Sequence, residues 1–342
     1  GRRQRQMCIR DSFSPAKIKI EGKIMPVNKL ELTPKMVRQA ALELMTEEQM
    51  EQFKDELEID FAISEQGLGR FRVNVFHQRG NVAMVLRYIT SELPSLDELG
   101  MPEQLKELTM LRRGLILMVG ATGAGKSTTL AAMINHRNEK TSSHIITIED
   151  PIEFLHPNKQ SIVNQREVGL DTKSYHRALM SAVRAAPDVI QIGEIRDRVA
   201  MQAALDMAGT GHLVLSTLHS NNAAETLDRI INMFPQEQHA QVFMDLAHYL
   251  RGILSQRLVR GRNGKRVAAV ELMLNTPHVK DLIMKGRIED VKEAHRDSGE
   301  QGMKTFDDAL LELYQDGTIT LEEAMNHADS RSNLEAKVNF GG

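Results

Sequence analysis

The 342-residue chain has no tryptophan, one cysteine and few aromatic residues, which make up 4% of the sequence. A single cysteine, Cys8, excludes a disulfide framework and a four-cysteine zinc site, and it fits a reducing compartment. Scarce aromatic side chains leave few stacking platforms for single-stranded nucleic acid. Charge of one sign is also lacking, because 43 basic and 46 acidic residues give a net charge of -3. No global field attracts nucleic acid or anionic lipid, and we expect no nucleic-acid partner.

Long apolar runs are absent as well. No stretch approaches the length that a bilayer span requires, and the first residues contain no secretory hydrophobic region. Charged residues at 26% and apolar residues at 41% form the balance of an ordinary soluble protein. These features predict a cytoplasmic protein, and the length predicts two domains.

The first twelve residues, GRRQRQMCIRDS, differ in character from the rest of the chain. One interpretation is a basic disordered arm. The string also resembles a remnant that becomes fused to unrelated reading frames in assembled sequences. We favour this second interpretation, treat residues 1–12 as a non-native segment, and exclude its arginines and Cys8 from functional argument.

Residues 13–90 alternate strand and helix signals. Thr33 followed by Pro34 predicts the start of a helix that extends through Leu44. Period-two patterns and turn residues predict strands at 17–20, 60–64, 70–76 and 82–89. We expect a small α+β domain, an antiparallel sheet with helices on one side.

Residues 91–102 hold two prolines and a glycine, and predict an interdomain linker. Short apolar strands then alternate with helices through residue 275, the pattern of a parallel sheet that is covered by helices on both faces. The strands are expected at 115–119, 144–148, 189–193 and 213–218. Residues 276–342 are expected to form a mostly helical C-terminal region and tail. The fold class is therefore α/β.

A phosphate-binding loop is the clearest motif. It fits the pattern G-x-x-x-x-G-K-[ST], follows a predicted strand and precedes a helix-compatible run. Its glycines let backbone N–H groups converge on phosphate oxygens, and the helix N-terminus adds positive potential. The Lys126 ammonium can contact the β- and γ-phosphates, and the Ser127 hydroxyl can ligate Mg²⁺. The predicted nucleotide-binding residues are Gly120, Ala121, Thr122, Gly123, Ala124, Gly125, Lys126, Ser127 and Thr128.

Two further predicted strands end in carboxylates. Glu194 follows the strand at 189–193, and strand ends in an open parallel sheet face the ligand crevice. We therefore expect Glu194 near Mg²⁺ or its water. Glu153 follows Pro151, which directs the chain away from helix and can hold the carboxylate towards the crevice. A carboxylate there can orient the water that attacks the γ-phosphate.

These segments together resemble the secretion ATPase superfamily. Four boxes carry the resemblance: the phosphate loop, the aspartate box at 147–154, the Walker B segment at 186–197 and a histidine box at 209–219 in which His212 and His219 bracket a strand. From about residue 16 to residue 330 the chain is similar to the type IV pilus retraction ATPases, the PilT and PilU group. His278–Ile283, in place of Ala-Ile-Arg-Asn-Leu-Ile, and the tail at 323–330 point to the PilU side. Gln191 departs from the apolar residue that is usual in the Walker B strand.

The resemblance implies a small PAS-like N-terminal domain, a RecA-like ATPase domain and binding of ATP with Mg²⁺. It also implies that the N-terminal domain is truncated at its start, because the family's first strand and helix are missing ahead of Ala16. It implies that Glu153 is the catalytic base, that Glu194 is the Walker B acid and a metal ligand, and that His219 senses the γ-phosphate. Arg72 and Arg87 are the candidate N-terminal arginines that reach the nucleotide when the domains close. The implied assembly is a homohexameric ring that drives pilus retraction with a PilT-type partner and an inner-membrane platform protein. Its implied place is the cytoplasmic face of the inner membrane, at the pilus base.

Three alternatives remain open. A pilus assembly or type II secretion ATPase usually carries a CxxC…CxxC zinc insertion, which Cys8 alone cannot supply. A DNA-dependent RecA-like motor requires a basic groove and stacking aromatic residues, and the charge balance argues only weakly against a local basic patch. A non-catalytic module with a degenerate phosphate loop is disfavoured, because Lys126, Ser127, Glu153 and Glu194 are all present.

Overall fold

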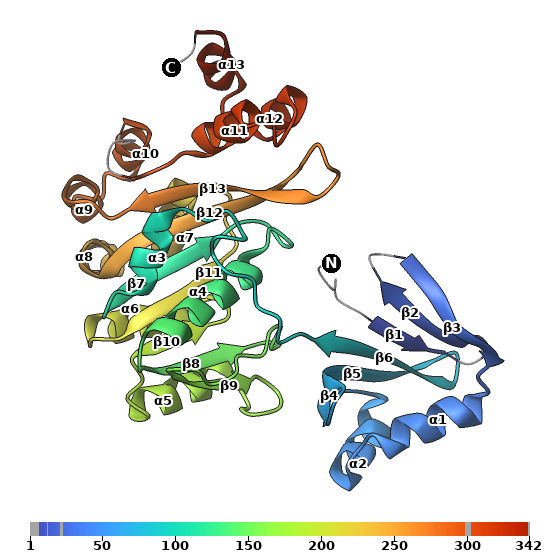
Figure 1. Cartoon of the computed structure of the whole chain (residues 1–342). Coiled ribbons are helices and arrows are strands. Elements are labelled where there is room, and N and C mark those ends of the chain that lie inside the picture. The colour runs from blue at the N-terminus through green and yellow to red at the C-terminus, as the bar shows by residue number, and fades with distance from the viewer. Residues whose placement is uncertain (1–6, 12, 21–22, 298–301, 341–342) are drawn as a thin grey trace. The chain divides into compact units, whose positions relative to one another are not determined.

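The computed structural model describes residues 7–11, 13–20, 23–297 and 302–340. The chain divides into two compact units. The first unit is Gly1–Glu92 together with Ile152–Leu155, and the second is Leu93–Pro151 with His156–Gly342. Figure 1 labels the elements of both units, which are described one at a time.

The first unit is a six-stranded antiparallel sheet in the order β3-β2-β1-β6-β5-β4, with two helices packed on it. Thr33 caps the first helix by accepting a hydrogen bond from the Met36 N–H, and Thr46 forms a capping box with Gln49 at the second. The strands are β1 (Met7–Arg10), β2 (Pro15–Ile20), β3 (Lys23–Glu31), β4 (Glu58–Glu65), β5 (Gly69–Gln78) and β6 (Asn81–Ile89), and the helices are α1 (Pro34–Glu43) and α2 (Glu47–Glu56).

The predicted strands at 17–20, 60–64, 70–76 and 82–89 and the helix capped by Thr33 are confirmed. Strand β3 was not predicted, and every residue along it is exposed, so it lacks the alternation that marks a half-buried strand. Residues Met7–Arg10, within the stretch set aside as non-native, pair with both β2 and β6. The rest of residues 1–12, except Asp11, lies outside the described residues. The sheet therefore begins before residue 13, the expected boundary of the domain.

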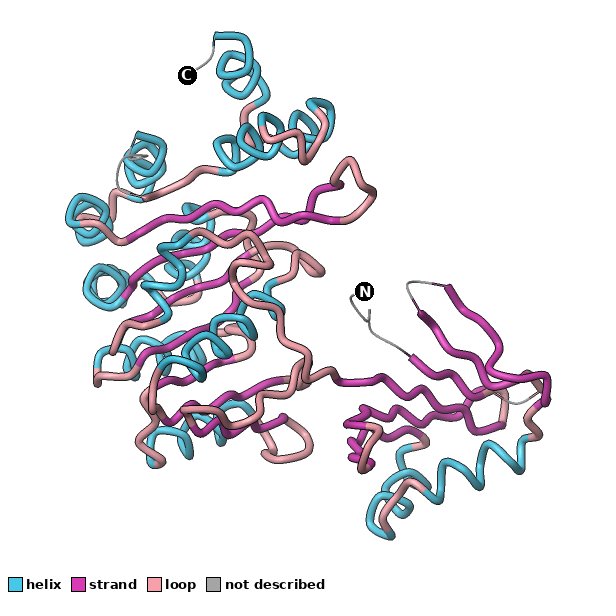
Figure 2. Tube along the Cα trace, viewed as in Figure 1, coloured by secondary structure: helices cyan, strands magenta, loops and turns pink. Residues whose placement is uncertain are grey.

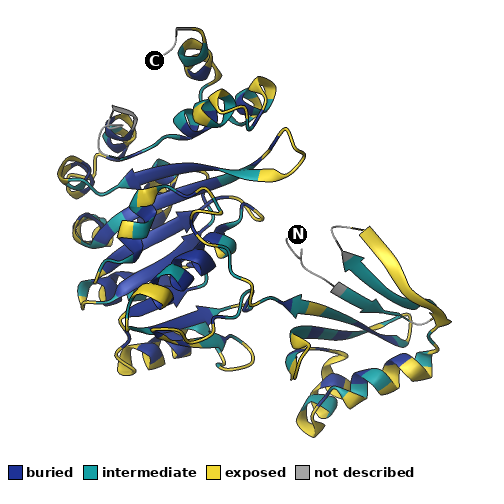
Figure 3. Ribbon diagram, viewed as in Figure 1, coloured by how far each residue is buried: buried dark blue, intermediate teal, exposed yellow. Residues whose placement is uncertain are grey.

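The second unit is built on a seven-stranded sheet in the order β13-β12-β7-β11-β10-β8-β9. All neighbours are parallel except β12 and β13. The strands are β7 (Gly114–Val119), β8 (His144–Glu149), β9 (Ile162–Glu167), β10 (Val189–Ile192), β11 (Leu213–Leu218), β12 (Leu250–Arg260) and β13 (Arg266–Leu274). The central strands β7, β10 and β11 are buried along their whole length (Figure 3), as expected for strands that are covered on both faces.

Helices flank this sheet, as Figure 2 shows, and two separate apolar clusters lie on its two faces. One cluster packs α3 and α4 against the sheet, and the other packs α5 to α10. The helices are α3 (Glu103–Thr109), α4 (Lys126–Lys140), α5 (Tyr175–Arg184), α6 (Arg198–Gly209), α7 (Ala223–Asn232), η1 (Gln236–Gln238), α8 (His239–Tyr249), α9 (Pro277–Met284), α10 (Ile288–Asp297), α11 (Phe306–Gln315), α12 (Leu321–His327) and α13 (Arg331–Phe340). The predicted α/β class and the helical C-terminal region are confirmed.

The stretch expected as a linker, residues 91–102, is divided between the units after Glu92. Leu96 and Met101 are buried in the cluster of α3 and α4, so most of the stretch packs on the second unit. The stretch packs there because burial removes its apolar side chains from water. Among the described residues, no helix combines the length and apolar character that crossing a membrane requires.

Candidate nucleotide site

The phosphate loop connects the end of β7 to the start of α4 and is shaped by glycine. Gly120, Gly123 and Gly125 all have positive φ angles, of 143°, 81° and 94°. A Cβ atom on Gly120 would lie 2.4 Å from the backbone oxygen of Gln256, and one on Gly125 would lie 2.7 Å from its side-chain nitrogen. The loop therefore needs glycine both for its backbone conformation and for its close approach to β12.

Lys126 opens helix α4 and folds back over the loop. Its ammonium nitrogen donates to the backbone oxygens of Gly120 at 2.6 Å and Ala121 at 3.0 Å. Burial lowers the pKa of Lys126, and the negative charge of Glu194 opposes that shift. Ser127 in the first turn is exposed, as are Ala121 to Gly123, so this part of the loop is open to a ligand.

The Walker B segment and the histidine box meet the phosphate loop at this edge of the sheet. Glu194 follows β10 and His219 follows β11. The His219 Nε2 atom lies 3.1 Å from the Glu194 Oε1 atom, and its Nδ1 atom lies 3.5 Å from the Lys126 ammonium. Three residues that sequence patterns selected separately therefore form one connected cluster. Parallel strands with neighbouring carboxyl ends produce this arrangement.

The two histidines of the histidine box lie at opposite ends of β11. His212 precedes the strand, and its ring nitrogen Nδ1 lies 3.1 Å from the backbone oxygen of Met207. His219 follows the strand at the end that contacts the phosphate loop. His212 therefore makes a local contact away from the site, and His219 is the histidine that lies in the site.

Glu153, Arg72 and Arg87 belong to the first unit. The segment of Glu153 joins that unit because Phe154 forms a parallel bridge with Thr90, and the Leu155 N–H donates to the Thr90 oxygen at 3.0 Å. Arg72 and Arg87 face each other across β5 and β6, and the Arg72 guanidinium lies 3.5 Å from an Asp60 carboxylate oxygen. The catalytic roles of these three residues stay predictions.

Two side chains of the site escaped sequence reasoning. Arg196, two positions after Glu194, forms an ion pair with its carboxylate at 3.1 Å. Gln256 is buried on β12 behind the loop, and its Oε1 atom accepts a hydrogen bond of 2.8 Å from the Thr129 hydroxyl of α4. Gln256 lies more than a hundred positions after the loop. The sequence offers no signal for it, because Gln256 lies between the polar residues Ser255 and Arg257.

Replacing Gln256 by leucine is expected to weaken nucleotide binding about three- to tenfold and to lower the midpoint of thermal unfolding. The Thr129 hydroxyl would keep only its longer contact, 3.4 Å, to the Gly125 oxygen. Titration with a fluorescent ATP analogue and a thermal unfolding scan measure the two effects. Gln241→Leu, on the exposed surface of α8, is the matched control. Unchanged affinity and unfolding midpoint in Gln256→Leu would show that the loop does not depend on this support.

The cluster fits the phosphate groups of a nucleotide. A glycine loop with exposed residues, an ammonium group and the N-terminus of the 15-residue helix α4 converge there. Backbone N–H groups and the helix dipole favour an anion at this position.

Comparison with known proteins agrees with this site. The sequence profile of the family described as type II/IV secretion system protein matches residues 10–326. The type IV pilus ATPase PilU of Pseudomonas aeruginosa is 51% identical over 96% of this chain and 86% of that protein. The type IV pilus retraction ATPase PilT of the same organism is 41% identical over 94% and 93%.

The fold agrees with a solved structure as well. The crystal structure of the pilus retraction motor PilT with bound ADP superposes with a TM-score of 0.90, at 42% identity, and the match covers 96% of this chain and 95% of that one. The resemblance inferred from the four boxes is thereby confirmed. The chain belongs to the type II/IV secretion system protein family and is one of its nucleotide-binding ATPases.

Proposed function

We propose that this ATPase drives retraction of type IV pili as a PilU-like accessory motor. The observation that carries the proposal is the cluster of Lys126, His219 and Glu194, in which an ammonium group, an imidazole and a carboxylate meet where parallel strands end. Near full-length similarity to PilU and PilT supports pilus retraction as the work that hydrolysis performs.

The proposed site binds ATP together with Mg²⁺. Ser127, exposed in the first turn of α4, and Glu194, at the end of β10, are the residues that would hold the metal. When bound, Mg²⁺ would neutralise part of the negative charge that develops on the phosphates. Lys126 contributes a fixed positive charge to the phosphates, and His219 contacts both Lys126 and Glu194, so it can report a change at either residue.

Three residues of the first unit complete the proposed mechanism. Glu153 acts as the general base that orients the attacking water, and Arg72 and Arg87 contact the transferring phosphoryl group once the units close. Nucleotide can drive closure only if the closed arrangement binds it more tightly than the open one. Arginines that reach phosphate only after closure supply that difference.

The proposed assembly is a homohexameric ring on the cytoplasmic side of the inner membrane, at the base of the pilus. Its proposed partners are a PilT-type retraction ATPase and the platform protein of the pilus machinery. In a closed ring, closure of one subunit displaces its neighbour, which converts hydrolysis into motion.

Pilus retraction in living cells tests this function. We expect the chain to increase retraction against load in a piliated strain that lacks its own PilU-type ATPase but keeps its PilT-type motor. Retraction events and stall force of fluorescently labelled pili are the measurements. Lys126→Ala is the control, because it removes the cation of the phosphate loop.

Two results would contradict the proposal. One is equal retraction with the chain, with Lys126→Ala and with an empty vector. The other is restored pilus assembly in a strain that lacks its assembly ATPase, which would instead favour an assembly motor.

A further inference from the structure

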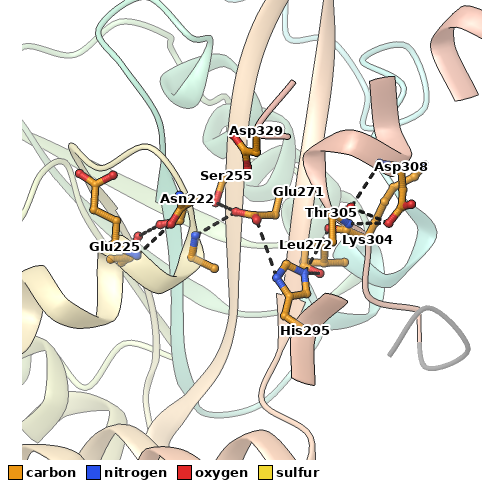
Figure 4. A network of polar contacts seen from close by, with 12 residues as sticks. Asn222, Glu225, Ser255, Glu271, Leu272, His295, Lys304, Thr305, Asp308 and Asp329 are labelled. Carbon is orange, nitrogen blue, oxygen red and sulfur yellow. Dashed lines mark hydrogen bonds and ion pairs between the residues drawn. The ribbon is translucent and has the colours of Figure 1, made fainter. Parts of the chain in front are cut away.

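A buried polar cluster joins β12 and β13 to the start of α7 and to α10, and it has no part in the mechanism above (Figure 4). Its centre is Glu271 on β13, which is 5% exposed, and His295 on α10, which is 6% exposed. Ionisable side chains are seldom this deeply buried unless they are paired or serve a purpose.

Glu271 holds the start of helix α7. Its Oε2 atom accepts a hydrogen bond of 2.9 Å from the backbone N–H of Ala223, the first residue of that helix, and one of 2.6 Å from the Ser255 hydroxyl of β12. An acceptor at a helix N-terminus satisfies a backbone group that has no partner within the helix. The side chain therefore joins three elements at one oxygen atom.

His295 faces the other oxygen atom of this carboxyl group. The Nε2 atom lies 3.1 Å from the Leu272 oxygen and 3.2 Å from the Lys304 oxygen, and because carbonyls only accept, Nε2 carries a proton. The Nδ1 atom lies 3.7 Å from the Glu271 Oε1 atom, which is within the range of an ion pair but longer than a hydrogen bond. With only that Nε2 proton, His295 is neutral, and an ionised Glu271 would leave a net negative charge buried. One further proton, on either residue, makes the pair neutral.

The charged groups around Glu271 and His295 favour this neutral state of the pair. Burial raises the pKa of Glu271, His295 opposes the shift, and Asp329, beyond α12, adds to it. Asp329 is itself paired with Arg257 of β12 at 2.6 Å. When a carboxyl group with a raised pKa faces an imidazole, the two groups together can keep one proton.

The first turn of α7 is tied to His219 by a short loop. Only Ser220, Asn221 and Asn222 separate His219 from the helix. The Ser220 hydroxyl lies 2.5 Å from the Thr226 hydroxyl, and the Asn222 side chain accepts from the Glu225 N–H at 2.9 Å. A shift of the helix start therefore moves His219 relative to Lys126 and Glu194.

We propose that Glu271 is a positioning residue for ATP hydrolysis, which holds the start of α7, and through it His219, by means of a proton that it shares with His295. The inference rests on the proposed role of His219 in hydrolysis. Glu271 acts through the loop of His219 and does not touch the nucleotide.

Steady-state hydrolysis by the purified full chain tests the positioning role. Glu271→Ala is expected to lower kcat about tenfold or more with a smaller change in KM, because His219 is misplaced while the phosphate loop is intact. Glu271→Gln is expected to retain most of the turnover. Its amide oxygen can accept from Ala223 and Ser255, and its amide group can donate to a neutral His295. Asp281→Asn, which alters an exposed ion pair with Lys285 on α9, is the control for loss of a carboxylate.

The pH dependence of unfolding tests the shared proton. The folded protein holds a proton that an unfolded carboxyl group releases above about pH 4.5, so a rise in pH favours unfolding. Above about pH 4.5 and up to the raised pKa of Glu271, the folding equilibrium constant of the parent is expected to fall, relative to that of Glu271→Gln, by up to about tenfold per pH unit. Thermal unfolding midpoints of the two proteins across this range measure the difference.

Three results would overturn the inference. They are full turnover in Glu271→Ala, equal losses of turnover in Glu271→Gln and Glu271→Ala, and parallel pH dependence of unfolding in the parent and Glu271→Gln. His219→Ala, measured alongside, shows whether the role of His219 or only the role of Glu271 is wrong. If His219→Ala hydrolyses ATP at the parent rate, the proposed role of His219 is wrong, and the inference about Glu271 is wrong with it. If it is impaired while Glu271→Ala is not, only the inference fails.

Discussion

Replacing Lys126 by alanine is expected to reduce ATP hydrolysis by at least about a hundredfold, the scale of losing a fixed charge at a transferring phosphoryl group. The Lys126 ammonium is held by the backbone oxygens of Gly120 and Ala121 and lies 3.5 Å from a His219 ring nitrogen. Alanine removes the charge and also the contact that connects the loop to the histidine box. Phosphate release at saturating ATP measures the effect on kcat, and a binding titration measures the effect on affinity.

Lys140→Ala is the matched control for this substitution. Lys140 lies at the other end of the same helix and is exposed, so it tests the loss of a lysine without any change at the loop. Hydrolysis by Lys126→Ala at the parent rate would show that the nucleotide site lies elsewhere.

Replacing Glu153 by alanine is expected to preserve nucleotide binding and to lower kcat by about a hundredfold to ten thousandfold, the usual contribution of a general base. A base acts on the attacking water in the transition state, so its loss lowers turnover more than affinity. Glu153 lies in the segment that groups with the first unit, through the contacts of Phe154 and Leu155 with Thr90.

A binding titration combined with single-turnover hydrolysis separates the two quantities. Glu65→Gln, an exposed carboxylate at the end of β4 in the same unit, is the control. Equal losses of affinity and turnover in Glu153→Ala would instead indicate a role in folding or in holding the metal.

The phosphate loop and its flanking strands could be predicted because their signals are local. Strand β7 is an uninterrupted apolar run between glycines, β11 is a largely apolar run between histidines, and the loop has a fixed spacing. Lys126, Glu194 and His219 could be placed on one edge because the ends of parallel strands share it. Their contacts of 3.5 Å and 3.1 Å required the strand order, which periodicity does not contain.

Strand β10 shows how a polar residue is accommodated within a predicted apolar strand. Gln191 departs from the apolar pattern, yet it is 7% exposed and pairs with both β8 and β11. Its Oε1 atom has no hydrogen-bond partner among the described residues. Backbone pairing on both sides and the buried neighbours Ile190 and Ile192 keep the strand in place.

The sequence by itself determined the fold class and the phosphate loop, since each depends on residues close together in the chain, and the resemblance to the secretion ATPases pointed to Glu194 and His219. Only the tertiary structure decided which distant side chains support them. Gln256 backs the phosphate loop, and Glu271 meets both α7 and His295, because pairing of β12 with β7 and of β13 with β12 brings these elements together. It also decided that the segment of Glu153 groups with the first unit, through a bridge to Thr90 formed across more than sixty positions. Such pairings depend on burial of the whole sheet, so a local sequence pattern cannot predict them.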